Sequence, residues 1–146
     1  MNGRDPADQR TIKSIAVVAE DVITAYEATT RTGRRTVLCI TRPFHGRMRA
    51  RLHVPGDGEG ETGAILIDAT DLVDRKLLPA YPDPDHTETE IREDPDREYS
   101  LDRHRDRHRE AVREWRANAR RAIVEEVAIE TPDGPHAIDV VALGVE

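Results

Sequence analysis

Residues 47–54 carry the pattern that most constrains the fold, because apolar and polar side chains alternate there without interruption. Successive side chains of an extended strand point to opposite faces, so strict alternation predicts a strand with one buried face. The side chains predicted to face the core are Met48, Ala50, Leu52 and Val54. The side chains predicted to face outward are Arg47, Arg49, Arg51 and His53. The pattern therefore predicts a half-buried strand with a basic outer face.

This strand lies in a basic stretch, residues 28–56, which holds seven arginines and no acidic residue. The segment that follows, residues 57–100, holds 14 acidic and 4 basic residues, and the whole chain has a formal net charge of −7. The basic stretch is thus the part of the chain most suited to an acidic partner. The candidate binding residues are the arginines of the strand and of the turn before it, Arg42, Arg47, Arg49 and Arg51.

Three roles fit this arginine face. Its guanidinium groups could pair with the acidic segment 57–100 or with acidic residues of a long helix, as on an ordinary solvated sheet. It could bind a protein partner or a second copy of the chain. It could also follow a nucleic-acid backbone, because side chains on one strand face recur about every 7 Å, close to the ~6–7 Å between successive phosphates. Two observations argue against nucleic acid. Phe44 is the only nearby aromatic residue on which a base could stack. With about four phosphate contacts, the logarithm of the binding constant would also fall by roughly 3.6 for each tenfold rise in salt concentration.

Composition indicates a single domain with an aliphatic core. The chain has 146 residues, of which 3% are aromatic and 35% are charged. Lysine occurs only at Lys13 and Lys76, against twenty arginines. An acidic, lysine-poor composition suits a protein that stays hydrated in concentrated salt, although a GC-rich genome favours the same residues. We favour salt adaptation.

The single cysteine and the absence of long apolar runs limit the location and the chemistry. Cys39 lies in an apolar strand pattern and excludes an intramolecular disulfide or a multi-cysteine zinc site. The N-terminus does not resemble a signal peptide, and no stretch approaches the ~20 apolar residues of a membrane span. The sequence therefore predicts a cytoplasmic protein that does not engage a membrane.

The order of predicted elements indicates an α+β fold. Residues 1–11 are predicted to be a flexible leader, and residues 12–146 a single α+β domain with an acidic, proline-rich, solvated connection at about 77–99. Strands are predicted at 12–18, 36–41, 47–54, 64–67, 127–131 and 137–143, the last two joined by a turn at 132–135. One helix is predicted from Glu20 to a stop at Gly33, and one from a Ser100 cap to about Val127, with a flexible loop at 55–63 and a short helical turn at 71–76. The resulting order β-α-β-β-β-α-β-β predicts a single mixed, mainly antiparallel sheet with two helices.

Two histidines on the long helix have the spacing of metal ligands. His104 and His108 are four residues apart and share a helix face. Arg105 stands where a zinc protease motif has its glutamate, and the arginines around the pair oppose a cation. A third ligand would have to come from His53, His86 or Asp68. We therefore favour histidines that hydrogen-bond to carboxylates or backbone, and we predict no metal and no cofactor.

Other catalytic patterns are weak. Cys39 is predicted to lie in a buried, unreactive strand, and no nucleophile elbow, phosphate loop or dinucleotide fingerprint is present. Trp115, the only tryptophan, lies on the apolar face of the long helix and is predicted to anchor the core.

Three segments together give a resemblance. They are the run PFHGRMRARLH at 43–53, the run YSLDRHR at 99–105, and the pair Trp115-Arg116. In this combination the chain, over about 12–143, resembles a family of small uncharacterised proteins from halophilic archaea. The resemblance implies a salt-adapted cytoplasmic protein and carries no catalytic residue or cofactor.

The sequence therefore favours a non-enzymatic cytoplasmic domain that binds a protein partner or itself through the arginine face. The alternative is a nucleic-acid-associated protein that uses Arg42, Arg47, Arg49 and Arg51. A distant third is a metal-dependent enzyme that uses His104 and His108.

Overall fold

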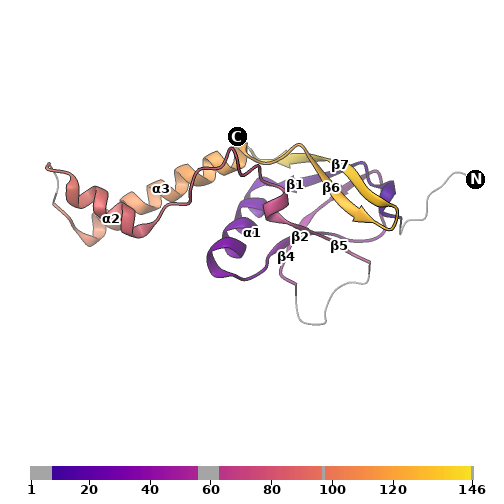
Figure 1. The fold of residues 1–146 in the computed structure, drawn as a ribbon, viewed down its shortest axis with the longest axis horizontal. Helices are drawn as coiled ribbons and strands as arrows, with labels where there is room; N and C mark the ends of the chain where they lie inside the picture. The colour runs from indigo at the N-terminus through magenta and orange to yellow at the C-terminus, as the bar shows by residue number, and fades with distance from the viewer. Residues whose placement is uncertain (1–7, 56–62, 97, 146) are drawn as a thin grey trace, which may run out of the picture.

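The computed structural model describes residues 8–55, 63–96 and 98–145. It contains three α-helices and two short 3-10 helices (Figure 1). The helices are η1 (Gln9–Thr11), α1 (Ala19–Thr32), η2 (Ala69–Asp71), α2 (Pro84–Glu93) and α3 (Leu101–Arg121). The strands are β1 (Ser14–Val18), β2 (Val37–Ile40), β3 (Arg47–Arg49), β4 (Arg51–His53), β5 (Ile65–Asp68), β6 (Glu126–Thr131) and β7 (Gly134–Leu143).

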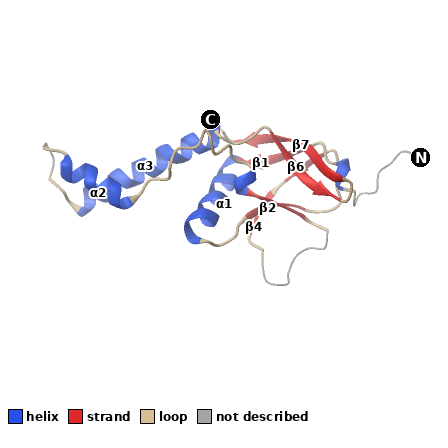
Figure 2. Cartoon of the chain, in the orientation of Figure 1, coloured by secondary structure: helices blue, strands red, loops and turns tan. Residues whose placement is uncertain are grey.

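The strands form two sheets rather than the predicted single sheet, although the α+β class is confirmed (Figure 2). Sheet A has the strand order β3-β1-β7-β6, in which β1 runs parallel to both β3 and β7 and β6 runs antiparallel to β7. Sheet B has the order β4-β2-β5 and is antiparallel throughout. Sheet A is therefore mixed, as predicted, and sheet B is purely antiparallel, so the prediction was wrong in placing all the strands in one sheet.

The predicted strand at 47–54 is broken at Ala50, and this break separates the two sheets. Ala50 is 1% exposed and its N–H donates to the Ala16 carbonyl at 3.0 Å, at the end of the pairing between β3 and β1. The next residues pair with β2 instead. Because β4 belongs to another sheet, the alternation fails after Ala50, and Leu52 and Val54 are 40% and 41% exposed instead of facing the core.

The two sheets are joined along the opposite side by backbone hydrogen bonds. The Val124 N–H donates to the Leu72 carbonyl at 2.9 Å, and the Asp74 N–H donates to the Ala122 carbonyl at 2.8 Å. These segments follow β5 and precede β6, so the edges of the two sheets meet there. The sheets therefore enclose one interior between them.

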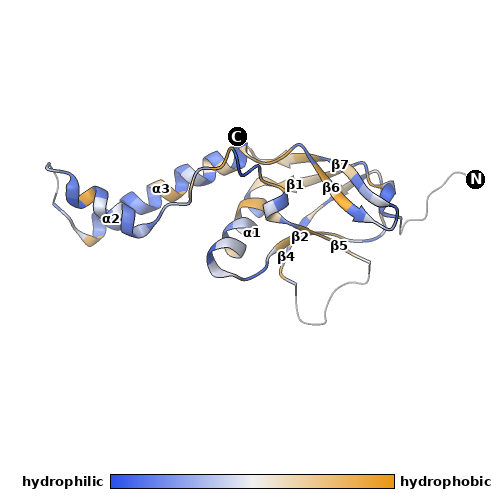
Figure 3. Cartoon of the chain, viewed as in Figure 1, coloured by the Kyte–Doolittle hydropathy of each residue, from blue (hydrophilic) through white to orange (hydrophobic). Residues whose placement is uncertain are grey.

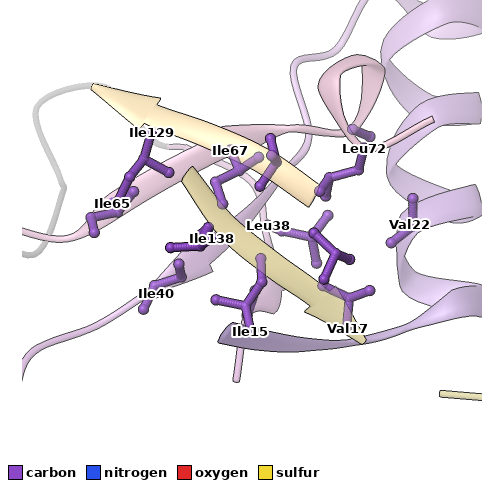
Figure 4. Close-up of a cluster of buried hydrophobic side chains, with 14 of the residues drawn as sticks. Ile15, Val17, Val22, Leu38, Ile40, Ile65, Ile67, Leu72, Ile129 and Ile138 are labelled. Atoms are coloured by element: carbon purple, nitrogen blue, oxygen red, sulfur yellow. The ribbon is translucent and has the colours of Figure 1, made fainter. Parts of the chain in front are cut away.

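That interior is filled by aliphatic side chains (Figure 4). The labelled side chains come from both sheets, from α1 and from the segment after β5. They are Ile15, Val17, Val22, Leu38, Ile40, Ile65, Ile67, Leu72, Ile129 and Ile138. An aromatic content of 3% leaves the core to these residues, with Phe44 as its one phenylalanine.

Helix α1 has the ends that the sequence predicts. Glu20 and Asp21 lie in its first turn, where acidic groups interact favourably with the helix dipole. Gly33 follows the last turn with φ of 73°, a left-handed conformation that glycine adopts without strain. The predicted stop at Gly33 is confirmed.

Residues 77–99 contain helix α2, where an extended connection was predicted. Asp83 caps this helix by accepting a hydrogen bond from the Asp85 N–H, and Pro84 occupies its first turn. Helix α2 packs against α3 to form a helical hairpin that extends away from the sheets (Figure 1). Figure 3 shows mostly hydrophilic residues along this hairpin.

Helix α3 begins at the predicted cap and ends earlier than predicted. The Ser100 hydroxyl accepts a hydrogen bond from the Arg103 N–H at 3.1 Å. The helix ends at Arg121, and Val127 lies in strand β6 instead. The turn at 132–135 is confirmed, with Gly134 at φ of 106°.

The C-terminal half of α3 packs on α1. Trp115 is 3% exposed and its Nε1–H donates to the Pro79 carbonyl at 2.9 Å, so its predicted role as a core anchor is confirmed. Arg116 forms ion pairs with Glu20 and Glu27 of α1. Partial burial lowers the pKa of the Arg116 guanidinium from its ordinary value. These contacts attach the helical hairpin to the rest of the fold.

Two other predictions concern residues that are described only in part. Residues 1–7 of the predicted flexible leader lie outside the described residues, and residues 9–11 form η1. Residues 56–62 of the predicted flexible loop also lie outside them.

Candidate interaction surface

The outer face of sheet A, the face away from the enclosed interior, is lined by residues from all four strands. Paired residues on neighbouring strands point to the same face of a sheet. Ser14 pairs with both Arg47 and Asp139, and Asp139 pairs with Glu126, so these four side chains form one row across the sheet. Ile15, the next residue along β1, is fully buried in the interior, so the Ser14 row faces outward.

The centre of this face is apolar and uncovered. Val141 and Leu143 of β7 are 50% and 43% exposed, and their partners on β1 are Ala16 and Val18, which are partly exposed. In Figure 2, α1 lies below sheet A and the α2–α3 hairpin extends to its left, so none of the described helices covers the upper face. Exposed Ala128 and Ala137 extend the apolar surface toward the β6–β7 turn. We call this surface the outer face of sheet A.

Opposite charges lie at the two ends of the one row that all four strands share, beside the apolar centre. Arg47 and Arg49 project from β3 on one edge, and Glu126 and Glu130 project from β6 on the other, with Asp139 beside them on β7. Three strand spacings of ~4.8 Å separate β3 from β6, so the two edges are roughly 14 Å apart. Within one copy, Arg47 therefore lies too far from Glu126 for an ion pair.

The structure brings two of the four candidate arginines together on this face. Arg47 and Arg49 share it, and all four arginines are exposed. Arg51 pairs with Cys39 of β2 and lies on the outer face of sheet B, because the chain changes sheets at Ala50. Arg42 lies in the loop before β3, in a shallow hollow that Arg10 and Asp133 also line. The four arginines thus do not form one continuous row.

The expected counter-ions of the arginine face are absent from the described part of the chain. Among the described residues, no ion pair or hydrogen bond joins the side chains of Arg47, Arg49 or Arg51 to an acidic group. The acidic residues of α3 and α2 pair instead within the hairpin, as Glu90 does with Arg107. The described residues therefore leave these three guanidinium groups facing solvent.

Phe44 cannot serve as a stacking platform, because it is 2% exposed and belongs to the core. Cys39, predicted to be buried, is partly exposed on the outer face of sheet B.

His104 and His108 hold the two helices of the hairpin together. The His104 Nε2–H donates to the Pro84 carbonyl at 2.8 Å, and His108 Nδ1 hydrogen-bonds to the Thr87 hydroxyl at 3.2 Å. Both partners belong to α2, so the favoured interpretation of hydrogen-bonded histidines is supported. Within the described ranges, no group of three or more His, Cys, Asp or Glu side chains is placed to hold a metal ion. The suggested third ligands are engaged elsewhere or distant in the fold: His86 pairs with Glu90, and Asp68 pairs with Arg35.

Sequence reasoning missed Val141 and Leu143. Their signal is the run Val140-Val141-Ala142-Leu143, which is apolar on both faces of β7. A strand whose two faces are both apolar is typical of burial on both sides, yet only one side of β7 faces the interior.

Comparison with known proteins gives one match. The model of a family described as Domain of unknown function (DUF8009) matches residues 1–144. No curated protein and no solved structure matches. Of the described helices, none combines the length and the apolar character needed to cross a membrane.

Proposed function

We propose a binding role for this chain, which belongs to the DUF8009 family because the family model spans nearly its whole length. The proposed function is that of a non-enzymatic interaction domain that binds protein through the outer face of sheet A. One observation carries the proposal: Val141 and Leu143 stand 50% and 43% exposed at the centre of a sheet face that none of the described helices covers.

The chemistry of this face supports protein binding. A contiguous exposed apolar patch with a polar rim is typical of an interaction site, whereas single exposed apolar residues are common on any protein surface. Binding would remove Val141 and Leu143 from water, and the burial of apolar surface stabilises a complex by ~25 cal/mol per Å². Arginine is enriched at protein interfaces because its guanidinium is weakly hydrated and forms several directed hydrogen bonds, so Arg47 and Arg49 suit the rim of this centre.

The structural use of the histidine pair supports the non-enzymatic part of the proposal. His104 and His108 direct ring nitrogens to backbone and hydroxyl groups of α2, which accounts for their spacing without a catalytic role. The hairpin that they stabilise stands away from the outer face of sheet A (Figure 1).

The proposed function is tested by site-specific photocrosslinking in cell extract from the source organism, with the photoreactive group at position 141 and, as a control, at position 77. Leu77 is 64% exposed and lies between η2 and α2, outside the strands of sheet A. A protein crosslinked from position 141 alone is then purified, and its dissociation constant is measured by calorimetry. We expect V141D to raise that constant at least tenfold, with L77D unchanged. If V141D and L77D changed the dissociation constant equally, the outer face of sheet A would be excluded as the binding site.

A second candidate function is nucleic-acid association through Arg47 and Arg49, with Arg42 and Arg51 on adjoining surfaces. The observation that favours it is the solvent exposure of the guanidinium groups of β3 and β4, without a carboxylate partner among the described residues. It predicts binding to single- or double-stranded nucleic acid that persists in molar salt and disappears in a folded R47A/R49A/R51A variant. Binding that occurs only at low salt, or that the variant retains, would exclude it.

We also propose that the acidic surface is an adaptation to a salt-rich cytoplasm. The net charge of −7 and the scarcity of lysine support it. Screening by salt weakens repulsion among like charges, so the free energy of unfolding should rise as KCl increases from ~0.1 to ~2 M. A fall over that range would contradict the adaptation.

A further inference from the structure

We propose that the occupant of the outer face of sheet A is the same face of a second copy of this chain. The two copies are related by a twofold axis that runs parallel to the strands, between β1 and β7, in the plane of the interface. This inference rests on the proposed function and names its partner.

The charges on the face are complementary under this rotation. A twofold axis along the strands keeps each row in place and exchanges the two sides of the sheet, so β3 of one copy lies opposite β6 of the other. Arg47 and Glu126 belong to the same row, through Ser14 and Asp139. The rotation therefore places Arg47 of each copy opposite Glu126 of the other, and the interface contains this pair twice.

The shapes in the centre are complementary as well. The rotation exchanges β1 with β7, so the small side chains of one strand face the larger ones of the other. Ser14 and Ala16 would face Asp139 and Val141, and Val18 would face Leu143. Interdigitation of small and large side chains is the usual packing of two aligned sheets.

The self-complementary arrangement favours a second copy over an unrelated partner. An isologous interface needs each group and its counterpart on one surface, at equal distances on either side of the axis. Arg47 and Glu126 at the two edges, and the small and large side chains of the central strands, meet that condition. For a partner of different sequence, this face would need only one group of each complementary pair, because the partner would supply the other.

The size of the face predicts a weak dimer. Under this rotation β1 and β7 face each other over five residues, and β3 and β6 only in the Arg47–Glu126 row, so at ~4.8 Å by ~3.3 Å per residue the facing surfaces cover roughly 200 Å². Stable interfaces bury about 800 Å² on each partner. We therefore expect a dissociation constant on the order of 10–1,000 µM, with exchange between monomer and dimer.

Sedimentation equilibrium from about 10 µM to about 1 mM, a range that spans this affinity, tests the proposal on the full chain. The variants are R47E, E126R and V141D, with L77D as the control and circular dichroism as the check on folding. Arg47 and Glu126 are exposed, so their charge reversal leaves the core intact. We expect wild type and L77D to dimerise, and each of the three face variants to weaken dimerisation at least tenfold.

An equimolar mixture of R47E and E126R gives the sharpest result. In a heterodimer, the glutamate introduced at position 47 of one copy would face the arginine introduced at position 126 of the other. The unchanged Glu126 of the first copy would face the unchanged Arg47 of the second, so both pairs are restored. We expect the mixture to associate within about threefold of wild type, although neither variant does so alone; a change of that size is below the tenfold that 1.4 kcal/mol produces. Ion pairs within one copy could not give this result.

The remaining outcomes separate this inference from the proposed function. A wild type that stays monomeric throughout the range overturns self-association, and the proposed function is then decided by the partner crosslinked from position 141. A wild type that dimerises equally with V141D overturns the use of this face by a second copy. Dimerisation that V141D abolishes but that the R47E and E126R mixture fails to restore overturns the proposed twofold arrangement.

Discussion

Replacement of Trp115 by alanine tests how the helical hairpin is attached to the sheets. Trp115 is 3% exposed, its ring centroid lies 4.6 Å from that of Tyr81 and 5.8 Å from that of Tyr26, and its indole donates to the Pro79 carbonyl. Truncation of a buried tryptophan typically costs about 3–5 kcal/mol. We expect W115A to lower the free energy of unfolding by that amount.

The loss should be local in origin. Trp115 packs with Ile23 and Ala119 in a cluster separate from the larger one between the sheets. Amide hydrogens of α3 should therefore exchange faster in W115A, while those of β1 and β7 keep most of their protection.

Urea unfolding followed by far-UV circular dichroism gives the measurement, because the variant lacks the only tryptophan fluorophore. W115F is the matched control. It keeps most of the ring and loses the hydrogen bond, so we expect a loss of about 1–2 kcal/mol. A loss below about 1 kcal/mol for W115A would refute the role of this residue as the anchor of the hairpin.

The remaining predictions concern stability and are each measured by urea unfolding against wild type. R116Q should lose about 1–3 kcal/mol, because it removes the partly buried arginine that pairs with Glu27 and leaves Glu20 paired with Arg120 alone. R109Q, which removes an exposed pair one turn apart, should lose less than about 0.5 kcal/mol. A50I should lose about 1–3 kcal/mol, because the added carbons enter a fully packed site where the chain passes from one sheet to the other. An unchanged stability would show that Ala50 is not tightly packed at this junction. G134A should lose about 1–3 kcal/mol because of its φ of 106°, whereas G46A, which has open space and no positive φ, should change little.

The local features of the fold could be predicted from the sequence. The Ser100 cap, the stop at Gly33 and the turn at 132–135 depend on a few adjacent residues whose backbone preferences are strong. The α+β class follows from the periodicity of the same segments.

The division into two sheets could not be predicted from the alternation at 47–54. The pattern fits one continuous strand, and the break at Ala50 arises because β1 is the partner before it and β2 the partner after it. Pairing with distant segments is a tertiary property that a local period does not contain.

Helix α2 was missed because its composition is acidic and proline-rich. Asp83 followed by Pro84 is nevertheless a recognisable start signal, with a capping side chain and a proline in the first turn. Its stability comes from packing on α3, through Thr87 and Ile91, which are almost fully buried.

The arginine edge of the candidate surface follows from the sequence, and its apolar centre does not. Arg47 and Arg49 stand out in a local pattern, whereas Val141 and Leu143 look like ordinary core residues until the sheet shows which side of β7 is covered. The assignment of Arg42 and Arg51 to the same surface fails because each lies beyond the ends of β3.

The outer face of sheet A as the interaction surface is tested most directly by NMR. Backbone amide chemical shifts of the full chain would be followed as its concentration rises from about 20 µM to about 1 mM, a range centred on the expected affinity. We predict shifts that saturate with one dissociation constant and concentrate in β1, β3, β6 and β7, with the α2–α3 hairpin unchanged. Shifts confined to the hairpin, or no shifts at any concentration, would contradict self-association through this face.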